Sequence, residues 1–336
     1  MASTIQILRL PPEIIILIAE CLGDDVSSIS NFYKTSMVIR QTLCSQCYRF
    51  RSNELGHIRS LQIGLTWSAC TVSYKLPSDL VPLLRSTLKE MPRLVVLSLS
   101  VTPGALDELL EGFDPPFRLI EFVHSGKLSS TVAQFLKTQS SITKLGWLSV
   151  FSQEQSGYLL SLLEDSLFLP ALSELAGSLR LLSAVIPRRS ITKIRLMYHT
   201  LAFIRLENSM AAFSCPMGQI SSLCIVEYRP TWQSWTAFIT KLETTCVRCT
   251  LKEVHIVEAF TGPGPLSWRN ELRAHVSRLA CFKSLEHLEI SRSPGVNVSI
   301  QALYERLKYY GMDSILSWKI IVPSLTSVTV YDYQLC

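Results

Sequence analysis

The sequence predicts an α/β protein in which a short helical module precedes a long array of strand–helix units. Three observations support this fold class. Apolar side chains make up 48% of the 336 residues and charged ones only 18%, so the chain can form an extensive core. A six-residue apolar pattern recurs from residue 58 onward, and helical patterns separate its copies. The preceding residues lack this pattern and predict an almost wholly apolar helix.

Composition and charge exclude several classes of protein. The longest uninterrupted apolar stretch, residues 14–19, is far shorter than the roughly 20 residues of a membrane-spanning helix, so we expect no membrane partner. A net charge of +5, without a Lys/Arg block, is not typical of a nucleic-acid-binding protein. Ten cysteines are too sparse for a disulfide scaffold, and prolines and glutamates interrupt the one candidate secretion signal. We therefore expect a reducing compartment, the cytoplasm and/or nucleus.

The first predicted helix covers residues 12–22. Pro11 and Pro12 fix φ where a helix begins, Glu13 suits the positive end of the helix dipole, and Gly23 suits a left-handed C-cap. Apart from two glutamates, the helix is apolar on all sides. One core usually covers only about a 100° face, so this helix is expected to be buried on two sides.

Two further helices complete the N-terminal module. Asp24 and Asp25 provide N-cap side chains for a helix over residues 26–34, and residues 37–50 predict a third. The module therefore resembles a compact helical hairpin of three short helices. The pattern shared with a known family consists of Leu10, Pro11, Glu13, Ile14, Ile18, Leu22, Asp25, Val26, Ile29, Phe32, Ser36, Val38 and Arg40.

This pattern resembles the F-box, a module of roughly forty residues, over residues 8–47. We assign the F-box-like module to residues 8–50. In that family the module docks on the Skp adaptor of cullin-type ubiquitin ligases. The resemblance implies an adaptor-binding surface made by Leu10, Pro11, Glu13, Ile14, Ile15, Ile18, Leu22, Val26 and Ile29. Alternatively, residues 10–22 form a core helix that begins at a Pro-Pro turn.

The remaining chain, residues 58–336, contains ten copies of the pattern apolar-x-x-apolar-x-apolar. The last three residues of each copy have strand spacing, so each copy predicts a short strand that follows a turn. The copies are Ile58/Leu61/Ile63, Leu94/Leu97/Leu99, Phe117/Ile120/Phe122, Ile142/Leu145/Trp147, Leu172/Leu175/Gly177, Ile191/Ile194/Leu196, Ile220/Leu223/Ile225, Leu251/Val254/Ile256, Leu285/Leu288/Ile290 and Leu325/Val328/Val330.

Helical patterns lie between the copies, so the strands are expected to be parallel. The predicted helical stretches are residues 80–88, 106–113, 132–136, 159–167, 235–242, 272–279 and 303–307. This alternation resembles the leucine-rich repeat, which implies an irregular solenoid with a concave parallel sheet and outer helices. The Asn or Cys that the family commonly carries after each strand is absent, so the turns must satisfy their backbone in other ways. A doubly wound α/β domain would share the alternation.

Charged side chains on the predicted strands suggest a target-binding surface. Glu253 and His255 flank Val254, as His287 and Glu289 flank Leu288. If these strands are neighbours in register, Glu253 lies beside His287 and His255 beside Glu289. Such a patch can be a pair of exposed ionic contacts or a recognition site whose affinity changes between pH 6 and 8. Metal binding is a third interpretation.

Earlier strands place Lys144, Lys193 and Arg195 at the same offsets, so one end of this face is expected to be basic and the other mixed. Two CxxC pairs, Cys44/Cys47 and Cys246/Cys249, are interpreted as buried helical cysteines rather than zinc ligands. The Gly/Pro-rich segment 260–268 predicts a surface loop.

No catalytic motif was found, so we expect no catalytic residues, no metal and no cofactor. Together the patterns favour a non-catalytic substrate receptor that binds a Skp-type adaptor through residues 8–50 and an unidentified target protein through the repeats, at Lys193, Arg195, Glu253, His255, His287 and Glu289. Two alternatives stay open. One is a leucine-rich-repeat scaffold whose N-terminal helices only cap the array, and the other is an α/β enzyme without a recognised motif.

Overall fold

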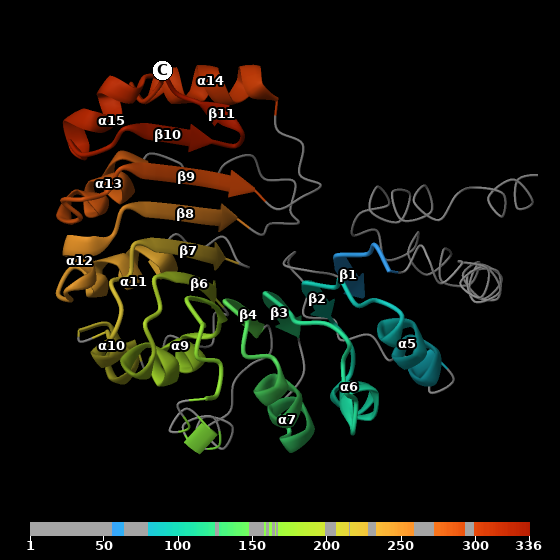
Figure 1. Cartoon of the computed structure of the whole chain (residues 1–336). Helices are drawn as coiled ribbons and strands as arrows, with labels where there is room; N and C mark the ends of the chain where they lie inside the picture. The colour runs from blue at the N-terminus through green and yellow to red at the C-terminus, as the bar shows by residue number, and fades with distance from the viewer. Residues whose placement is uncertain are drawn as a thin grey trace, which may run out of the picture. The chain divides into compact units, whose positions relative to one another are not determined.

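The computed structural model describes residues 56–63, 80–124, 128–147, 158, 161–162, 165, 167–198, 206–214, 216–227, 233–258, 272–292 and 299–336. The chain divides into two compact units, residues 1–58 and 59–336. The predicted helices of the N-terminal module, and all the adaptor-binding residues inferred from the sequence, lie outside the described residues. The fold described below is that of the second unit (Figure 1).

One largely parallel sheet runs through this unit, and its strands follow one another in the order of the sequence. The strands are β1 (Ser60–Ile63), β2 (Val96–Leu99), β3 (Glu121–His124), β4 (Lys144–Trp147), β5 (Glu174–Gly177), β6 (Lys193–Tyr198), β7 (Ser222–Glu227), β8 (Glu253–Glu258), β9 (His287–Arg292), β10 (Ser327–Val330) and β11 (Tyr333–Gln334). β1 to β10 pair in parallel, and β11 pairs with β10 in antiparallel fashion. A doubly wound domain reverses its strand order at a switch point, whereas this sheet does not.

The final hairpin follows from backbone conformation. Tyr331 and Asp332 both have positive φ, 49° and 67°, as the two central residues of a type I′ turn require. This turn matches the natural twist of two antiparallel strands, so the chain reverses between β10 and β11. The parallel sheet therefore ends on an antiparallel strand.

Helices connect the strands, and α5 to α13 lie along one side of the sheet in Figure 1. They are α5 (Leu80–Lys89), α6 (Pro103–Leu110), α7 (Ser130–Thr138), α9 (Leu179–Val185), α10 (Leu206–Ser214), α11 (Gln233–Leu242), α12 (Val247–Thr250), α13 (Leu272–Ser277), α14 (Ile300–Tyr309) and α15 (Ile315–Ile321), with 3₁₀ turns η1 (Ile186–Arg188) and η3 (Arg278–Cys281). Ser129, Ser178 and Ser299 cap α7, α9 and α14 by accepting the amide hydrogen of the residue three positions later. Within the described ranges, no helix is long and apolar enough to cross a bilayer.

Most of the predicted helical stretches are confirmed. Those at residues 80–88, 106–113, 132–136, 235–242 and 303–307 fall on α5, α6, α7, α11 and α14, and the stretch at 272–279 covers α13 and the start of η3. The stretch at 159–167 is described only in part. The sequence pattern missed α9, α10 and α15, because these helices have only seven to nine residues and little room for a repeating apolar face.

The apolar anchors of the copies form the core on the helix side of the sheet. Leu97, Leu145, Ile194 and Leu223 are buried, as are the anchors at the start of most copies. One copy was predicted in the wrong register. β3 pairs Phe122 with Leu97 and Leu145, so its anchors are Leu119, Phe122 and His124 instead of Phe117, Ile120 and Phe122. Ile120 is accordingly 46% exposed. The pattern failed there because a histidine occupies the third apolar position.

Backbone carbonyl groups at the strand starts hold successive repeats in register. The Thr143 carbonyl accepts hydrogen bonds from the amides of Ser173 (3.0 Å) and Glu174 (2.9 Å), and the Ser173 carbonyl accepts from those of Thr192 (2.9 Å) and Lys193 (3.1 Å). The hydroxyls of Ser173 and Thr192 donate to the same two carbonyls, at 3.4 and 3.3 Å. The same two-amide arrangement recurs across the sheet, so each turn satisfies its backbone without an asparagine.

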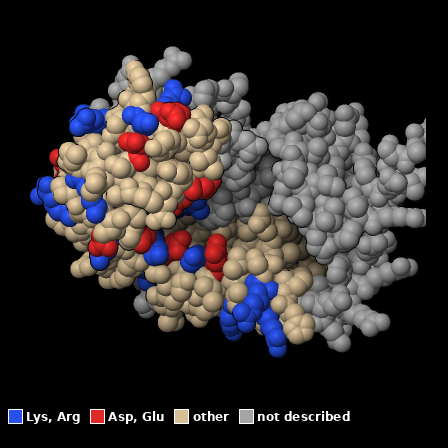
Figure 2. All heavy atoms as spheres, turned by 90° about the horizontal axis from the view of Figure 1, so that it is seen from above, with Lys and Arg blue, Asp and Glu red and all other residues tan. Residues whose placement is uncertain are grey.

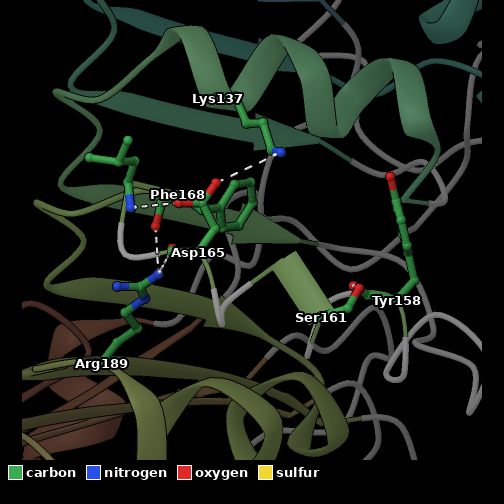
Figure 3. A network of polar contacts seen from close by, with 7 residues as sticks. Lys137, Tyr158, Ser161, Asp165, Phe168 and Arg189 are labelled. Atoms are coloured by element: carbon green, nitrogen blue, oxygen red, sulfur yellow. Dashed lines mark hydrogen bonds and ion pairs between the residues drawn. The ribbon is translucent and has the colours of Figure 1, made fainter.

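A polar network fastens three neighbouring connections on the helix side (Figure 3). The Arg189 guanidinium donates to the backbone carbonyls of Phe168 (2.7 Å) and Asp165 (3.0 Å). The Asp165 carboxylate in turn accepts from the Leu167 amide at 2.9 Å and lies 3.8 Å from Lys137 Nζ on α7. Burial lowers the pKa of Arg189 from its ordinary value, and the nearby Asp165 charge opposes this shift. The network therefore joins α7, the connection before β5 and the connection before β6.

Candidate binding face of the sheet

The inner face of the sheet, which is the face turned away from the core anchors, carries side chains in aligned rows. Parallel pairing in register places one residue of each strand beside its counterpart on the next strand. The first row is Ser60, Val96, Glu121, Lys144, Glu174, Lys193, Ser222, Glu253, His287 and Ser327. The second row includes Ala176, Arg195, Cys224, His255, Glu289 and Thr329, and the third row includes Met197, Val226, Val257 and Ser291.

The predicted register between β8 and β9 is confirmed. Glu253 lies beside His287 and His255 beside Glu289. Only the second of these pairs is in direct contact: His255 Nε2 lies 3.3 Å from Glu289 Oε1. His287 Nδ1 is instead 2.8 Å from the hydroxyl of Ser327 on the next strand. The four residues thus share one surface without forming two equivalent Glu–His pairs.

Charges of both signs alternate at the other end of the first row. Lys144 and Lys193 are separated by Glu174, and Glu121 lies beside Lys144 on the opposite side. Lys144 Nζ is 3.3 Å from Glu174 Oε2. The expectation of a basic end is therefore wrong, because glutamates occupy the intervening strands. Figure 2 shows one face of the molecule, on which basic and acidic side chains lie interspersed.

The second row brings together a cysteine and a histidine that the sequence analysis did not connect. Cys224 Sγ on β7 lies 3.8 Å from His255 Nδ1 on β8. The other ring nitrogen, Nε2, lies 2.6 Å from the hydroxyl of Ser291 on β9, close to the Glu289 contact. Arg195 on β6 approaches the Cys224 thiol from the opposite side. Cys224 has apolar neighbours in the sequence, which is typical of a small core residue, yet its strand offset matches those of Arg195, His255 and Glu289.

Buried apolar side chains explain the electrostatics of this cluster. Met197, Val226 and Val257 of the third row are buried together with Val123, and Cys224 packs against them. The second row therefore lies at the border between apolar and polar surface. Groups at such a border lose hydration, which disfavours their charged forms.

The pKa shifts of Cys224 and His255 follow from this burial. Burial raises the pKa of Cys224 to about 11, against the opposing charge and hydrogen bond of Arg195. Burial also lowers the pKa of His255, while Glu289 raises it and Arg195 lowers it further. Both groups are therefore neutral near pH 7. The network is then satisfied when the thiol donates to Nδ1 and the Nε2 hydrogen points to Ser291 and Glu289.

A neutral pair is poorly suited to nucleophilic catalysis. Cysteine enzymes depend on a thiolate, which a neighbouring base or a lowered pKa supplies. Here the proton stays on sulfur, because the thiol pKa is raised and that of the histidine is lowered. The cluster fits a rigid, hydrogen-bonded part of a binding surface better than a reactive centre.

The remaining sequence candidates do not join this surface. Cys246 and Cys249 are exposed at α12 and not buried as expected, because that helix is a single turn with Cys246 at its N-cap. Cys44/Cys47 and the loop at 260–268 lie outside the described residues. Among the residues that the structure describes, no three metal-ligating side chains cluster closely enough to hold an ion.

Comparisons with family models and with curated proteins find no match for this chain. The fold and the site thus define an α/β protein with a sequentially ordered parallel sheet and a polar, mixed-charge inner face.

Proposed function

We propose that the chain is a non-catalytic substrate receptor of a cullin-type ubiquitin ligase. In this proposal residues 8–50 dock on a Skp-type adaptor, and the inner face of the sheet binds a target protein. Holding the target near the ubiquitin donor raises the effective concentration of its lysines, and the transfer chemistry belongs to the partners. No cofactor is needed, and the role belongs to the cytoplasm and/or nucleus.

The observation that carries the target-binding half is the sequential, parallel strand order. An array with one strand per repeat, and helices on one side, supports the assignment to an irregular leucine-rich-repeat solenoid. Such an array gives a continuous row of side chains from β1 to β10, which is long enough to contact a folded partner. The alternating charges of the first row and the half-buried polar cluster of the second row favour specific recognition of a protein surface.

The adaptor-binding half rests on the sequence. A helix that is apolar on nearly all sides needs cover beyond one core, and an adaptor would supply that cover. In the alternative, the same helix packs on the array and only caps it, and the chain is a scaffold without a ligase role. The neutral thiol and histidine of the inner face weigh against the enzyme alternative.

The proposal is tested by co-expressing the full chain with a Skp adaptor and isolating the complex. We expect a stable complex in equal amounts, and we expect deletion of residues 1–50 to abolish it while residues 59–336 still unfold cooperatively. If the full chain stays monomeric and does not bind the adaptor at micromolar concentration, the ligase role is wrong and the scaffold alternative is favoured. Loss of cooperative unfolding in the truncated chain would identify the helices as an integral cap.

A further inference from the structure

We propose that the inner face across β6, β7 and β8 receives an α-helix of the partner, with one acidic and one basic side chain seven residues apart on the contacting side. This inference deepens the proposed function, because it names the kind of target element that the inner face binds. It rests on the charges, spacing and exposure of the first row.

Across β6 to β8, two opposite charges in this row have no ion-pair partner among the described residues. Lys193 on β6 and Glu253 on β8 are both exposed, and neither side chain forms an ion pair or hydrogen bond within the described part of the chain. Neighbouring charges differ, because Lys144 pairs with Glu174 at 3.3 Å and Lys252 pairs with Glu286 at 3.6 Å. Lys193 and Glu253 are therefore the charges of this region that a ligand can engage without breaking an existing ion pair.

The second row reinforces the same polarity. Arg195 lies beyond Lys193 on the same strand, so β6 presents two basic side chains. Glu289, on the strand after β8, has a side chain that is 49% exposed and adds negative charge on the other side. Ser222, between Lys193 and Glu253, is small and half-buried, so its own side chain does not fill the space between the two charges. A ligand that crosses from β6 to β8 thus meets a positive end and then a negative end.

The spacing of the two charges matches a helix. Neighbouring strands lie roughly 4.8 Å apart, so Lys193 and Glu253 are separated by about 9.6 Å across two intervals. Residues seven positions apart on one face of a helix are about 10.5 Å apart along its axis. A tilt of roughly 25° from the perpendicular to the strands shortens that projection to about 9.5 Å.

An extended peptide fits less well. Side chains on one face of a strand repeat every second residue, so they are about 6.7 Å or about 13.4 Å apart. Both spacings differ from the separation of the two charges by about 3 Å or more, whereas the helical spacing differs by about 1 Å. The edge of the sheet is not required for such docking, because the helix would lie on side chains and not on backbone groups.

The test is a selection from a displayed library of single helices, with the full chain as bait. Four positions on one helix face, at i, i+3, i+4 and i+7, are each Glu, Lys or Ala, and a parallel library of linear, proline-containing peptides carries the same residues. We expect enrichment of Glu and Lys seven residues apart, in either order because a helix can bind in both directions, by about tenfold over same-charge combinations at this spacing. The bait Lys193→Glu should instead enrich two lysines at that spacing.

Lys308→Glu is the matched control bait, because Lys308 is exposed on α14 and the substitution changes the net charge equally. It should enrich the same helices as the unmodified chain. The inference is wrong if the linear library is enriched in place of the helical one, or if Lys193→Glu leaves the preferred charges unchanged while its melting curve matches that of the control. The selection involves no adaptor, so it is independent of the co-expression experiment. If helices are enriched but no adaptor complex forms, only the ligase role is wrong. If the adaptor complex forms but no helix is preferred, only this inference is wrong.

Discussion

A buried histidine makes the sheet sensitive to acid. His124 occupies the third anchor of β3, where it is fully buried, with its ring 5.4 Å from that of Phe122 and 4.0 Å from that of Trp147 between centroids. Burial lowers its pKa from 6.5 to about 3. In the unfolded chain the same side chain gains a proton below its ordinary pKa. Between these two values the unfolded state binds more protons, so stability falls as the pH falls.

The size of the effect follows from the two pKa values. From pH 7.5 to pH 5, His124 alone should lower the free energy of unfolding by about 2 kcal/mol, and by about 3 kcal/mol at pH 4. His124→Leu removes the titrating group and places an apolar side chain at an anchor position. The pH-dependent part of the difference between the two proteins isolates the histidine, because the other titrating groups are common to both.

Urea unfolding of both proteins at pH 7.5 and pH 5 measures this difference. We expect the unmodified chain to lose about 2 kcal/mol more than His124→Leu over that interval. Equal losses in the two proteins would show that His124 is not held neutral in the core. The register of β3, which depends on that placement, would then be wrong.

Three other outcomes follow from the same contacts. Gly177→Ala should lower the free energy of unfolding by about 1–3 kcal/mol, because a Cβ there would lie 2.9 Å from the backbone oxygen of Trp147. The control Gly104→Ala in α6 places its Cβ in open space and should leave the stability unchanged or raise it. Equal melting temperatures for the two variants would contradict the close packing at Gly177. Because burial raises the pKa of Cys224 to about 11, this thiol should react with iodoacetamide about 100-fold more slowly at pH 7.5 than a thiol of pKa 9.0. Rapid labelling at neutral pH would contradict the raised pKa and favour the enzyme alternative. Because burial lowers the pKa of His255, any change in target affinity that its protonation causes should lie below pH 6.5 rather than between pH 6 and 8. The affinity for the target is measured as a function of pH with the unmodified chain and with His255→Gln. A change centred above pH 7 that disappears in this variant would contradict the burial of His255.

The sequence revealed the strands more reliably than the chemistry of their exposed side chains. Apolar anchors repeat along the chain, so even the register of Glu253 against His287 could be predicted from two copies of one pattern. The pattern failed at β3, where His124 replaces an apolar anchor. It also missed the Cys224–His255 contact, because residues on different strands come together only through the register of the sheet. Short capped helices such as α9 were not predicted, because they are too short to show an apolar periodicity.

The central claim is that separate surfaces bind an adaptor and a target. Its most direct test is quantitative mass spectrometry of the proteins that co-purify with three full-length chains. These are the unmodified chain, a chain with Pro11→Ala and Ile14→Asp, and a chain with Lys193→Glu. An unpaired carboxylate in an apolar interface costs several kcal/mol, so the double substitution should remove the Skp adaptor and retain the target. Lys193→Glu should remove the target and retain the adaptor. If the unmodified chain carries no Skp adaptor, or if both altered chains lose the same proteins, the receptor account is contradicted.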